Sequence, residues 1–437
     1  MRISREPRAR TRSITAVVVL AGALVATNVS GLGAQAAPKA AAADPAVITA
    51  WNATTVATVV TDAGKASPEA FLFFAYQQAA VYNAVVGITR EYELYKWHKH
   101  GPRGASPEAA AAAAAHRLLL NYFPASQSRL DTALASSLAR VPDGHAKDQG
   151  VRYGERAADR MIELRTDDGR NASVTYNVAP APGVWRPTPT AFAPFALPWL
   201  SQVRPLMISS PDQFRPAPPP AMSSATYAQE FDEVKAYGVK TGSLRTPDQT
   251  QTAMLFSDIS FGPLQAALRD VATRRRLDIS DSARLFAAAD MSIADGAVAV
   301  WDSKLHYALW RPITAIHEAA DDGNPATVPQ GDWQPLINNP PYPDYASGLS
   351  SVVCALSRAV TRVLGDGRVD LNITSVAAGL PGPPLTRHYD FAADLDRDVI
   401  DARVWLGIHF RSADVAGGQI GTSVANWALD HYFQPTA

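Results

Sequence analysis

Residues 280–307 read SDSARLFAAADMSIADGAVAVWDSKLHY, and this stretch decides the fold class. Its apolar residues recur at spacings of three and four, which is the period of an α-helix and not the alternation of a strand. The sequence therefore predicts one long helix here, ending in a charged and aromatic segment around Lys304.

The same helical period recurs on both sides of this stretch, with glycine or proline in the gaps. Strand alternation is scarce. The expected class is all-α, with an N-terminal helical bundle over residues 45–165 and a C-terminal helical bundle over residues 224–437, packed together. Further helices are expected over residues 51–63, 68–86, 107–122, 126–140, 147–164, 227–237, 247–257, 263–275, 347–364, 392–408 and 417–432.

Between the two expected bundles, residues 166–223 are rich in proline, interleaved with aromatic residues such as Trp185 and Phe195. A flexible linker is normally poor in aromatic residues. We therefore expect an ordered connecting belt that wraps over the helices. A disordered tether is the alternative.

Residues 1–36 have the pattern of a secretory signal peptide: arginines, then an apolar run over residues 14–26, then Ala34-Gln35-Ala36 as a cleavage pattern. The run is shorter than the roughly 20 residues that a membrane-spanning helix needs. We expect a secreted, extracellular protein with no membrane attachment after cleavage. An uncleaved signal anchor is the alternative.

The composition is that of an ordinary globular protein, with 47% hydrophobic residues and 40 Lys and Arg against 41 Asp and Glu. A formal net charge of -1 gives no general attraction for nucleic acid. The single cysteine, Cys354, excludes an internal disulfide. Any anion must therefore be bound by a local cluster of cations.

A first such cluster follows the long helix. Lys304 and Arg311 are seven residues apart, which would place both on one face of a helix. Pro312 predicts that the helix ends at Arg311, beside Trp310. The alternative is a solvated cationic helix end.

A second cluster is the proline-rich turn that contains Tyr342 and Asp344 and leads to Ser347-Gly348. Because a helix is expected from residue 347, its free backbone N–H groups and the serine hydroxyl would form an anion site. An ordinary serine N-cap is the alternative.

A third cluster is Arg403-x5-His409. An unpaired charge in the apolar helix that carries Arg403 would be costly, so we expect an anionic partner. A structural core histidine is the alternative for His409. Taken together, the clusters supply three cations, two donors at Ser347 and Gly348, and an imidazole, which is what a tetrahedral oxyanion requires.

The three clusters together resemble the signature of a known protein family. Lys304-x6-Arg311-Pro312, the Ser347-Gly348 turn and Arg403-x5-His409 are similar to the signature shared by vanadium-dependent haloperoxidases and type 2 phosphatidic acid phosphatases. Flanking residues such as Gly407-Ile408-His409-Phe410-Arg411 resemble the secreted bacterial haloperoxidase branch.

The resemblance implies vanadate as cofactor, bonded to the imidazole of His409. Lys304, Arg311, Arg403, Ser347 and the Gly348 N–H would hold its oxygens, and Lys304 would also polarise bound peroxide. Hydrogen peroxide, a halide and a small organic substrate would be the partners. In the phosphatase relatives the same pocket holds phosphate, with the equivalent of His409 as nucleophile.

The sequence departs from this signature at two places. The family's central motif reads Pro-Ser-Gly-His, whereas this chain has Ala346-Ser347-Gly348-Leu349. Loss of a general acid/base typically costs roughly 10²- to 10⁴-fold in rate. The acidic residue expected four positions after His409 is displaced to Asp414. Supporting or substitute groups in the vicinity are Tyr342, Asp344, His388, Asp414 and Trp310, each of which also has a structural interpretation.

Three functions remain open. The leading hypothesis is a haloperoxidase homologue that halogenates or cyclises an organic metabolite, with an altered proton path. The second is a non-redox rearrangement of a hydroxyketone, of the acyl-shift isomerase type, in the same pocket; the loss of a histidine at Leu349 favours it. The third is a phosphatase or a non-catalytic anion binder. A homodimer is one assembly we consider.

Overall fold

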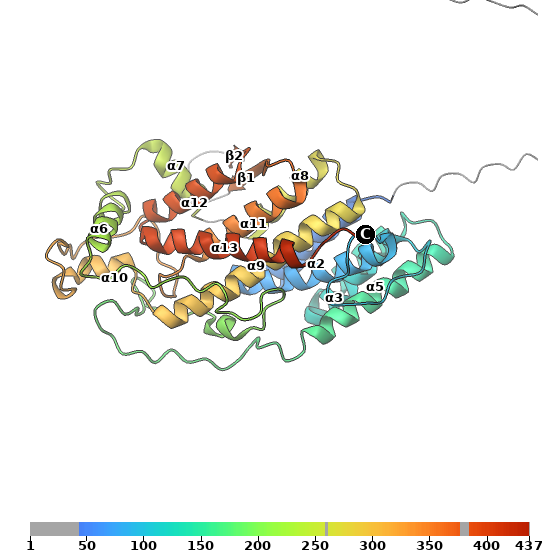
Figure 1. Ribbon diagram of the computed structural model, residues 1–437, viewed down its shortest axis with the longest axis horizontal. Helices are drawn as coiled ribbons and strands as arrows, with labels where there is room; N and C mark the ends of the chain where they lie inside the picture. Colours follow the sequence, from blue (N-terminus) through green and yellow to red (C-terminus); the bar gives the residue numbers. More distant parts are fainter. Residues whose placement is uncertain (1–42, 258–260, 376–383, 437) are drawn as a thin grey trace, which may run out of the picture. The chain divides into compact units, whose positions relative to one another are not determined.

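The computed structural model describes residues 43–257, 261–375 and 384–436 (Figure 1). The expected signal peptide lies outside the described residues. From Ala43 onward the chain forms one compact unit.

Helices make up almost all of the regular structure, and the expected all-α class is confirmed. The N-terminal helices are α1 (Ala46–Thr55), which continues as a π-helical segment (Val56–Asp62), α2 (Ser67–Thr89), α3 (Pro107–Tyr122), α4 (Gln127–Leu138) and α5 (His145–Leu164). The later helices are α6 (Ala225–Tyr237), α7 (Pro247–Leu255), α8 (Phe261–Arg274), α9 (Ile279–Tyr307), α10 (Pro312–His317), α11 (Gly348–Leu364), α12 (Ala392–Trp405) and α13 (Arg411–His431).

The long predicted helix is α9, and its ends follow from local chemistry. Asp278 caps the start, because its side chain accepts the backbone N–H of Asp281. The helix ends at Tyr307, because Ala308 adopts a left-handed conformation with φ 47°. The prediction of a helix continuing to Arg311 is therefore wrong.

A two-stranded sheet was not predicted. β1 (Leu371–Ser375) pairs antiparallel with β2 (Leu385–Tyr389), with Leu371 opposite Tyr389. The hairpin packs on α8 and α12. His388, expected in a loop, lies in β2.

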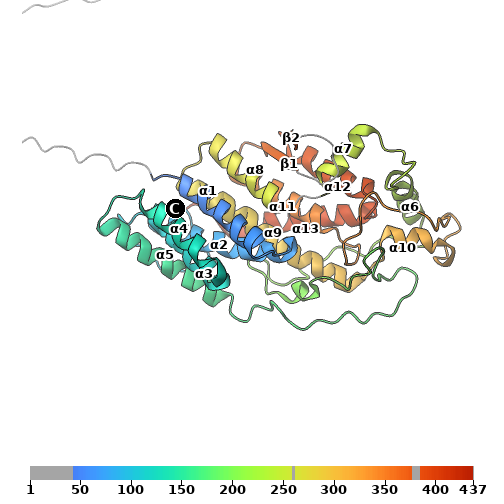
Figure 2. The same ribbon diagram turned by 180° about the vertical axis from the view of Figure 1, so that it is seen from behind.

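The two bundles share one apolar core. α9, α11 and α13 lie side by side, with α2 against α9 (Figure 1). Seen from behind, α3, α4 and α5 lie together, with α3 and α5 packed on α2 and with α1 next to α3 and α4 (Figure 2). One cluster of buried apolar residues extends from Val47 in α1 to Phe433 after α13. The C-terminal bundle is thus held by helices from both parts of the chain.

α2 is the one described helix long and apolar enough to cross a membrane by length and composition. In this fold 94% of its most apolar window is buried inside the protein. Its hydrophobicity is accounted for by its place in the core.

The proline-rich belt is ordered and tied to α9, as predicted. Both carboxylate oxygens of Asp295 accept backbone N–H groups of residues 206–208, at 2.6 to 3.0 Å. Arg215 forms a two-pronged ion pair with Asp302, at 2.7 and 2.8 Å. Trp185 is 1% exposed. The alternative of a disordered tether is wrong.

α11 and α13 approach each other closely at the start of α11. A Cβ on Gly417 would lie 2.3 Å from the carbonyl oxygen of Ser347, so only glycine fits there. The Ser347 N–H in turn donates to the carbonyl of Ala413 at 2.8 Å. The Ser347-Gly348 turn is thereby fixed against α13.

Candidate active site

Lys304 lies in the last turn of α9 with its side chain completely buried. Its Nζ donates to the carbonyl oxygens of Pro343, at 2.6 Å, and Asp344, at 3.0 Å. An ammonium group has three N–H donors, so one remains for a ligand. Burial lowers the pKa of Lys304 well below its usual value, and the charge of Arg311 lowers it further.

Arg311 reaches the same place by a different route from the one predicted. It does not share a helix face with Lys304; it precedes α10 in an extended conformation. Its Nε donates to the carbonyl of Tyr342, at 2.9 Å, and its Nη1 to that of Ile408, at 2.6 Å. Its side chain is completely buried, so the alternative of a solvated helix end is also wrong.

Arg403 and His409 flank the turn that ends α12. Arg403 is 6% exposed and donates from Nη1 to the carbonyl of Phe256 at 3.0 Å. Gly407 turns the chain with φ 78°, and a Cβ there would lie 2.5 Å from the carbonyl oxygen of Gly238. This glycine turn brings His409 back into the interior, where it is 1% exposed.

His409 is surrounded by charged side chains. Its Nδ1 lies 2.7 Å from Asp344 Oδ1, at an angle outside that of a regular hydrogen bond. Arg311 Nη1 lies 3.2 Å from its Nε2. Burial lowers the pKa of His409 well below its usual value, and the nearby cations add to this. A neutral imidazole keeps a lone pair for a bond to an electrophile.

The carboxylate beside His409 is Asp344, not Asp414. Burial raises the pKa of Asp344 to about 7, against the opposing charges of Arg311 and Lys304. Asp414, which we considered as the partner of His409, is buried on α13 and accepts a hydrogen bond from Ser350 Oγ at 3.1 Å. The displaced acid of the third motif therefore supports the serine turn.

Ser347 occupies the N-cap position of α11, but its side chain makes no capping hydrogen bond. Its Oγ lies 3.2 Å from Ser350 Oγ instead. The ordinary N-cap alternative is therefore wrong. Gly348 is the first residue of the helix, where backbone N–H groups have no partner within the helix.

Two donors in this cluster are buried without any hydrogen-bond partner among the described residues: Arg311 Nη2 and Arg403 Nε. Leaving such charged donors unpaired is costly. Three cations with spare donors fit a tetrahedral oxyanion such as vanadate or phosphate. We call Lys304, Arg311, Ser347, Gly348, Arg403 and His409 the oxyanion cradle. In the described part of the chain, no group of three or more His, Cys, Asp and Glu side chains could hold a metal cation.

A pocket of about 240 Å³ opens beside the cradle. Gly348 and Arg403 form part of its wall, and so does Leu349 of α11. The position that carries a histidine in the family motif therefore faces this pocket with an apolar side chain. Its lining is Ser67, Pro68, Phe71, Phe256, Ser257, Ala297, Trp301, Pro340, Tyr342, Gly348, Leu349, Val352 and Arg403.

Tyr342 covers two of the cations. Lys304 Nζ lies 4.9 Å from the centre of its ring, and the guanidinium carbon of Arg311 lies 5.1 Å from it. The ring also packs against Trp301, with ring centres 5.1 Å apart. Cation–π contacts of this kind hold the charges in place without neutralising them.

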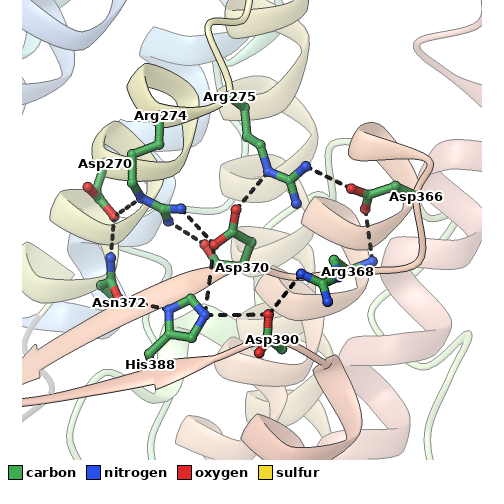
Figure 3. A network of polar contacts seen from close by, with 9 residues as sticks. All are labelled: Asp270, Arg274, Arg275, Asp366, Arg368, Asp370, Asn372, His388 and Asp390. Atoms are coloured by element: carbon green, nitrogen blue, oxygen red, sulfur yellow. Dashed lines mark hydrogen bonds and ion pairs between the residues drawn. The ribbon is translucent and has the colours of Figure 1, made fainter.

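Two sequence candidates lie outside the site. Trp310 is completely buried in a separate apolar cluster with Tyr227 and Phe231. His388 is half-exposed on β2 and bonds through Nδ1 to Asn372 Oδ1 at 2.9 Å. It belongs to a set of charged side chains around the hairpin (Figure 3). We call this set the hairpin network: Asp270, Arg274, Arg275, Asp366, Arg368, Asp370, Asn372, His388 and Asp390.

One wall of the pocket comes from helices in which the sequence indicates no functional residue. Ser67 and Phe71 come from the start of α2, and Phe256 follows α7. Ser350 was also not predicted as a site residue. Ser67 and Phe71 lie more than 200 residues before the cradle, and no local pattern distinguishes them from other residues of a buried helix.

Comparison with known proteins places the cradle in a known type of domain. A family model described as the VCPO second helical-bundle domain matches residues 284–436, which contain the whole cradle. The vanadium chloroperoxidase of Curvularia inaequalis is 22% identical over 365 residues, covering 65% of this chain and 60% of that protein. The chain thus spans less than two thirds of this relative's length.

Solved structures show the same fold. A bacterial vanadium-dependent iodoperoxidase aligns with a TM-score of 0.72 and 24% identity, over 89% of this chain and 97% of that one. A holo-type bacterial vanadium-dependent chloroperoxidase aligns with a TM-score of 0.68 and 18% identity, again over 89% and 97%.

Proposed function

Because this chain belongs to the vanadium haloperoxidase family, we propose that the oxyanion cradle holds vanadate and that the protein uses hydrogen peroxide to oxidise a halide there. The oxidised halide would then halogenate or cyclise a small organic substrate. The observation that carries the proposal is the pair of buried, unpartnered donors, Arg311 Nη2 and Arg403 Nε, in the same cluster as the buried His409.

The residues of the cradle divide the work. Lys304, Arg311 and Arg403 would hold the oxygens of the anion, together with the Ser347 hydroxyl and the Gly348 N–H. His409 would offer Nε2, because its other ring nitrogen, Nδ1, lies beside Asp344 Oδ1. Arg311 Nη1, 3.2 Å from Nε2, would then have to turn toward the anion. Vanadate, when bound, supplies a Lewis acid that activates peroxide without changing its oxidation state.

Proton transfer is the weak point of this site. Leu349 cannot exchange a proton, and none of the described residues that line the pocket is a histidine. Asp344 can hold a proton beside His409, because burial raises its pKa to about 7. We therefore expect halide oxidation slower than in a homologue with histidine at this position, by roughly 10²- to 10⁴-fold.

The test measures bromide oxidation by the purified protein with vanadate and hydrogen peroxide. The wild type should show slow, vanadate-dependent oxidation. Leu349→His should raise the rate at least about 10-fold, since it restores an acid/base at the pocket. Leu349→Asn is the matched control, with a polar side chain that cannot transfer a proton, and should show no gain. His409→Ala should abolish the reaction. The absence of bromide oxidation in both the wild type and Leu349→His, with vanadate bound, would exclude the proposal.

The second candidate is a non-redox rearrangement, which the apolar side chain of Leu349 in the pocket favours. Here the cradle cations would polarise the carbonyl of a hydroxyketone, and His409 would remove a proton. This function predicts conversion of a hydroxyketone without peroxide, and no gain from Leu349→His. Binding of phosphate without any turnover would instead indicate an anion-binding protein.

A further inference from the structure

A buried chain of polar side chains leads away from the cradle toward α13. Ser350 Oγ lies 3.2 Å from Ser347 Oγ and donates to Asp414 Oδ1 at 3.1 Å. All three side chains are completely buried. Asp414 Oδ2 has no hydrogen-bond partner among the described residues. Ser347, a member of the cradle, is therefore linked to the buried carboxyl group of Asp414, both directly and through Ser350.

The direction of the hydroxyl hydrogens depends on that carboxyl group. A serine hydroxyl has one hydrogen to donate and two lone pairs. As a carboxylate, Asp414 accepts hydrogens, so Ser350 and then Ser347 turn theirs away from the cradle. As a carboxylic acid, Asp414 donates to Ser350, Ser350 donates to Ser347, and the Ser347 hydrogen is free for an anion.

The groups that face Asp414 come from several elements. Burial has the largest effect and raises the pKa of Asp414 well above its usual value. Hydrogen bonds from Ser347 and Ser350 and the charge of Arg403 on α12 act in the opposite direction, while Asp344 raises it further. Lys304 and Arg311 also sense its charge, as does the buried thiol of Cys354 on α11.

We propose that Asp414 is a positioning residue, which decides, directly and with Ser350, whether the hydroxyl hydrogen of Ser347 points into the cradle. Oxyanion affinity is then coupled to a proton that sits outside the cradle and does not contact the anion. The inference rests on the proposed function only in that the cradle must bind an oxyanion.

Sulfate is the probe for the test, because it is tetrahedral and keeps the same charge between about pH 5 and pH 9. Its affinity for the purified full chain is measured by calorimetry across this range. The wild-type affinity should fall as pH rises, by about 10-fold or more, which corresponds to the loss of one charge-assisted hydrogen bond.

Asp414→Asn should remove most of this fall. An asparagine amide can donate to Ser350 at every pH, so the variant should match the wild type near pH 5 and bind about 10-fold more tightly near pH 9. Asp414→Asn also removes a charge that acts on Lys304 and Asp344, and the Ser347→Ala background measures this effect separately. In that background Asp414→Asn should have a clearly smaller effect, because only the effect of the charge remains.

Ser351→Ala is the matched control, since Ser351 is a neighbouring buried serine whose Oγ has no hydrogen-bond partner among the described residues. It should leave the pH profile unchanged. Coincident profiles for the wild type and Asp414→Asn would overturn the inference. An Asp414→Asn effect that is equally large without the Ser347 hydroxyl would also overturn it, as would uniformly weaker sulfate binding in a folded Asp414→Asn variant.

If Asp414→Asn fails to fold, Ser347→Ala alone decides, because it should reduce the slope of the wild-type profile to the part that Asp344 and Lys304 contribute. An unchanged slope overturns the inference. Failure of the proposed function gives a different result. In that case the wild type binds neither sulfate nor vanadate. If instead the wild type oxidises bromide, but Asp414→Asn has the same pH profile of sulfate affinity as the wild type, only the inference is overturned.

Discussion

The oxyanion cradle and the hairpin network both concentrate arginines and carboxylates, yet they differ in how the charges are paired. In the hairpin network, Arg274 contacts Asp270 at 2.8 Å and Asp370 at 2.6 Å. Arg275 contacts Asp366 and Asp370, both at 2.7 Å. Each of these guanidinium groups meets carboxylates at ion-pair distance, near solvent (Figure 3).

In the cradle the arginines instead donate to backbone carbonyls and retain unpartnered donors. The nearest carboxylate oxygen of Asp344 is 3.6 Å from Arg311 Nη1. Backbone carbonyls orient a guanidinium without cancelling its charge. The difference indicates that spare buried charge, not the number of charged residues, identifies a site for an anionic ligand.

The largest predicted effect separates the two clusters by anion affinity. Arg403→Ala should weaken vanadate binding by roughly 10- to 100-fold, because it removes a charge-assisted donor in a buried site. Arg274→Ala removes a paired arginine and should leave vanadate affinity unchanged. Equal effects of the two substitutions on vanadate affinity, measured by calorimetry, would show that unpaired buried arginines bind the anion no better than paired ones.

A second prediction concerns the carboxylate beside His409. Asp344→Asn should lower the rate of halide oxidation by roughly 10- to 100-fold, the usual cost of losing a group that orients a ligand to a metal. Vanadate titration on the same protein separates weaker binding from slower turnover. An unchanged rate would show that the backbone alone orients the imidazole.

A third prediction isolates burial from ion pairing. Asp290 is completely buried and accepts a hydrogen bond from Gln265 Nε2 at 2.5 Å, and burial raises its pKa to about 8. Between pH 4 and pH 8 the folded state therefore binds more protons than the unfolded state, so the free energy of unfolding falls as pH rises.

Asp290→Asn removes this dependence. Its stability relative to the wild type should increase by at least about 1.4 kcal/mol from pH 4 to pH 8, which is the equivalent of one pKa unit. Denaturant unfolding at both pH values checks the sign. If the free energy of unfolding of Asp290→Asn instead falls relative to that of the wild type as pH rises, the prediction is wrong.

The smallest effect is expected in the hairpin network. Arg275→Ala should lower the free energy of unfolding by about 0.2–1 kcal/mol, the usual range for exposed ion pairs. The loss should shrink as salt is added, since exposed charges are screened. A loss that does not depend on salt would show that these ion pairs are shielded from solvent, as the charges of the cradle are.

The sequence predicted the helices well because their apolar period is strong, as in α9 and α3. It predicted the members of the cradle because Lys304, Arg311, Ser347, Arg403 and His409 keep the spacing of a known signature. The route was less predictable, since the left-handed residue Ala308 and the turn at Gly407 decide how these side chains converge.

Partners that depend on tertiary structure could not be predicted. Asp344 and Asp414 were both candidates for supporting groups, but nothing in the sequence indicates that Asp344, and not Asp414, lies beside His409. The hairpin strands were missed because they are five residues long with a short polar alternation, which helix-rich neighbours obscure.

The pocket wall contributed by α2 is separate in sequence from the residues of the cradle. Ser67 and Phe71 line the pocket beside the cradle, while every residue of the cradle comes from residues 304–409. If the proposed organic substrate binds in this pocket, substitutions at the start of α2 would change substrate selectivity without altering the cradle. A library confined to α2 would be the economical way to evolve new substrates on this scaffold.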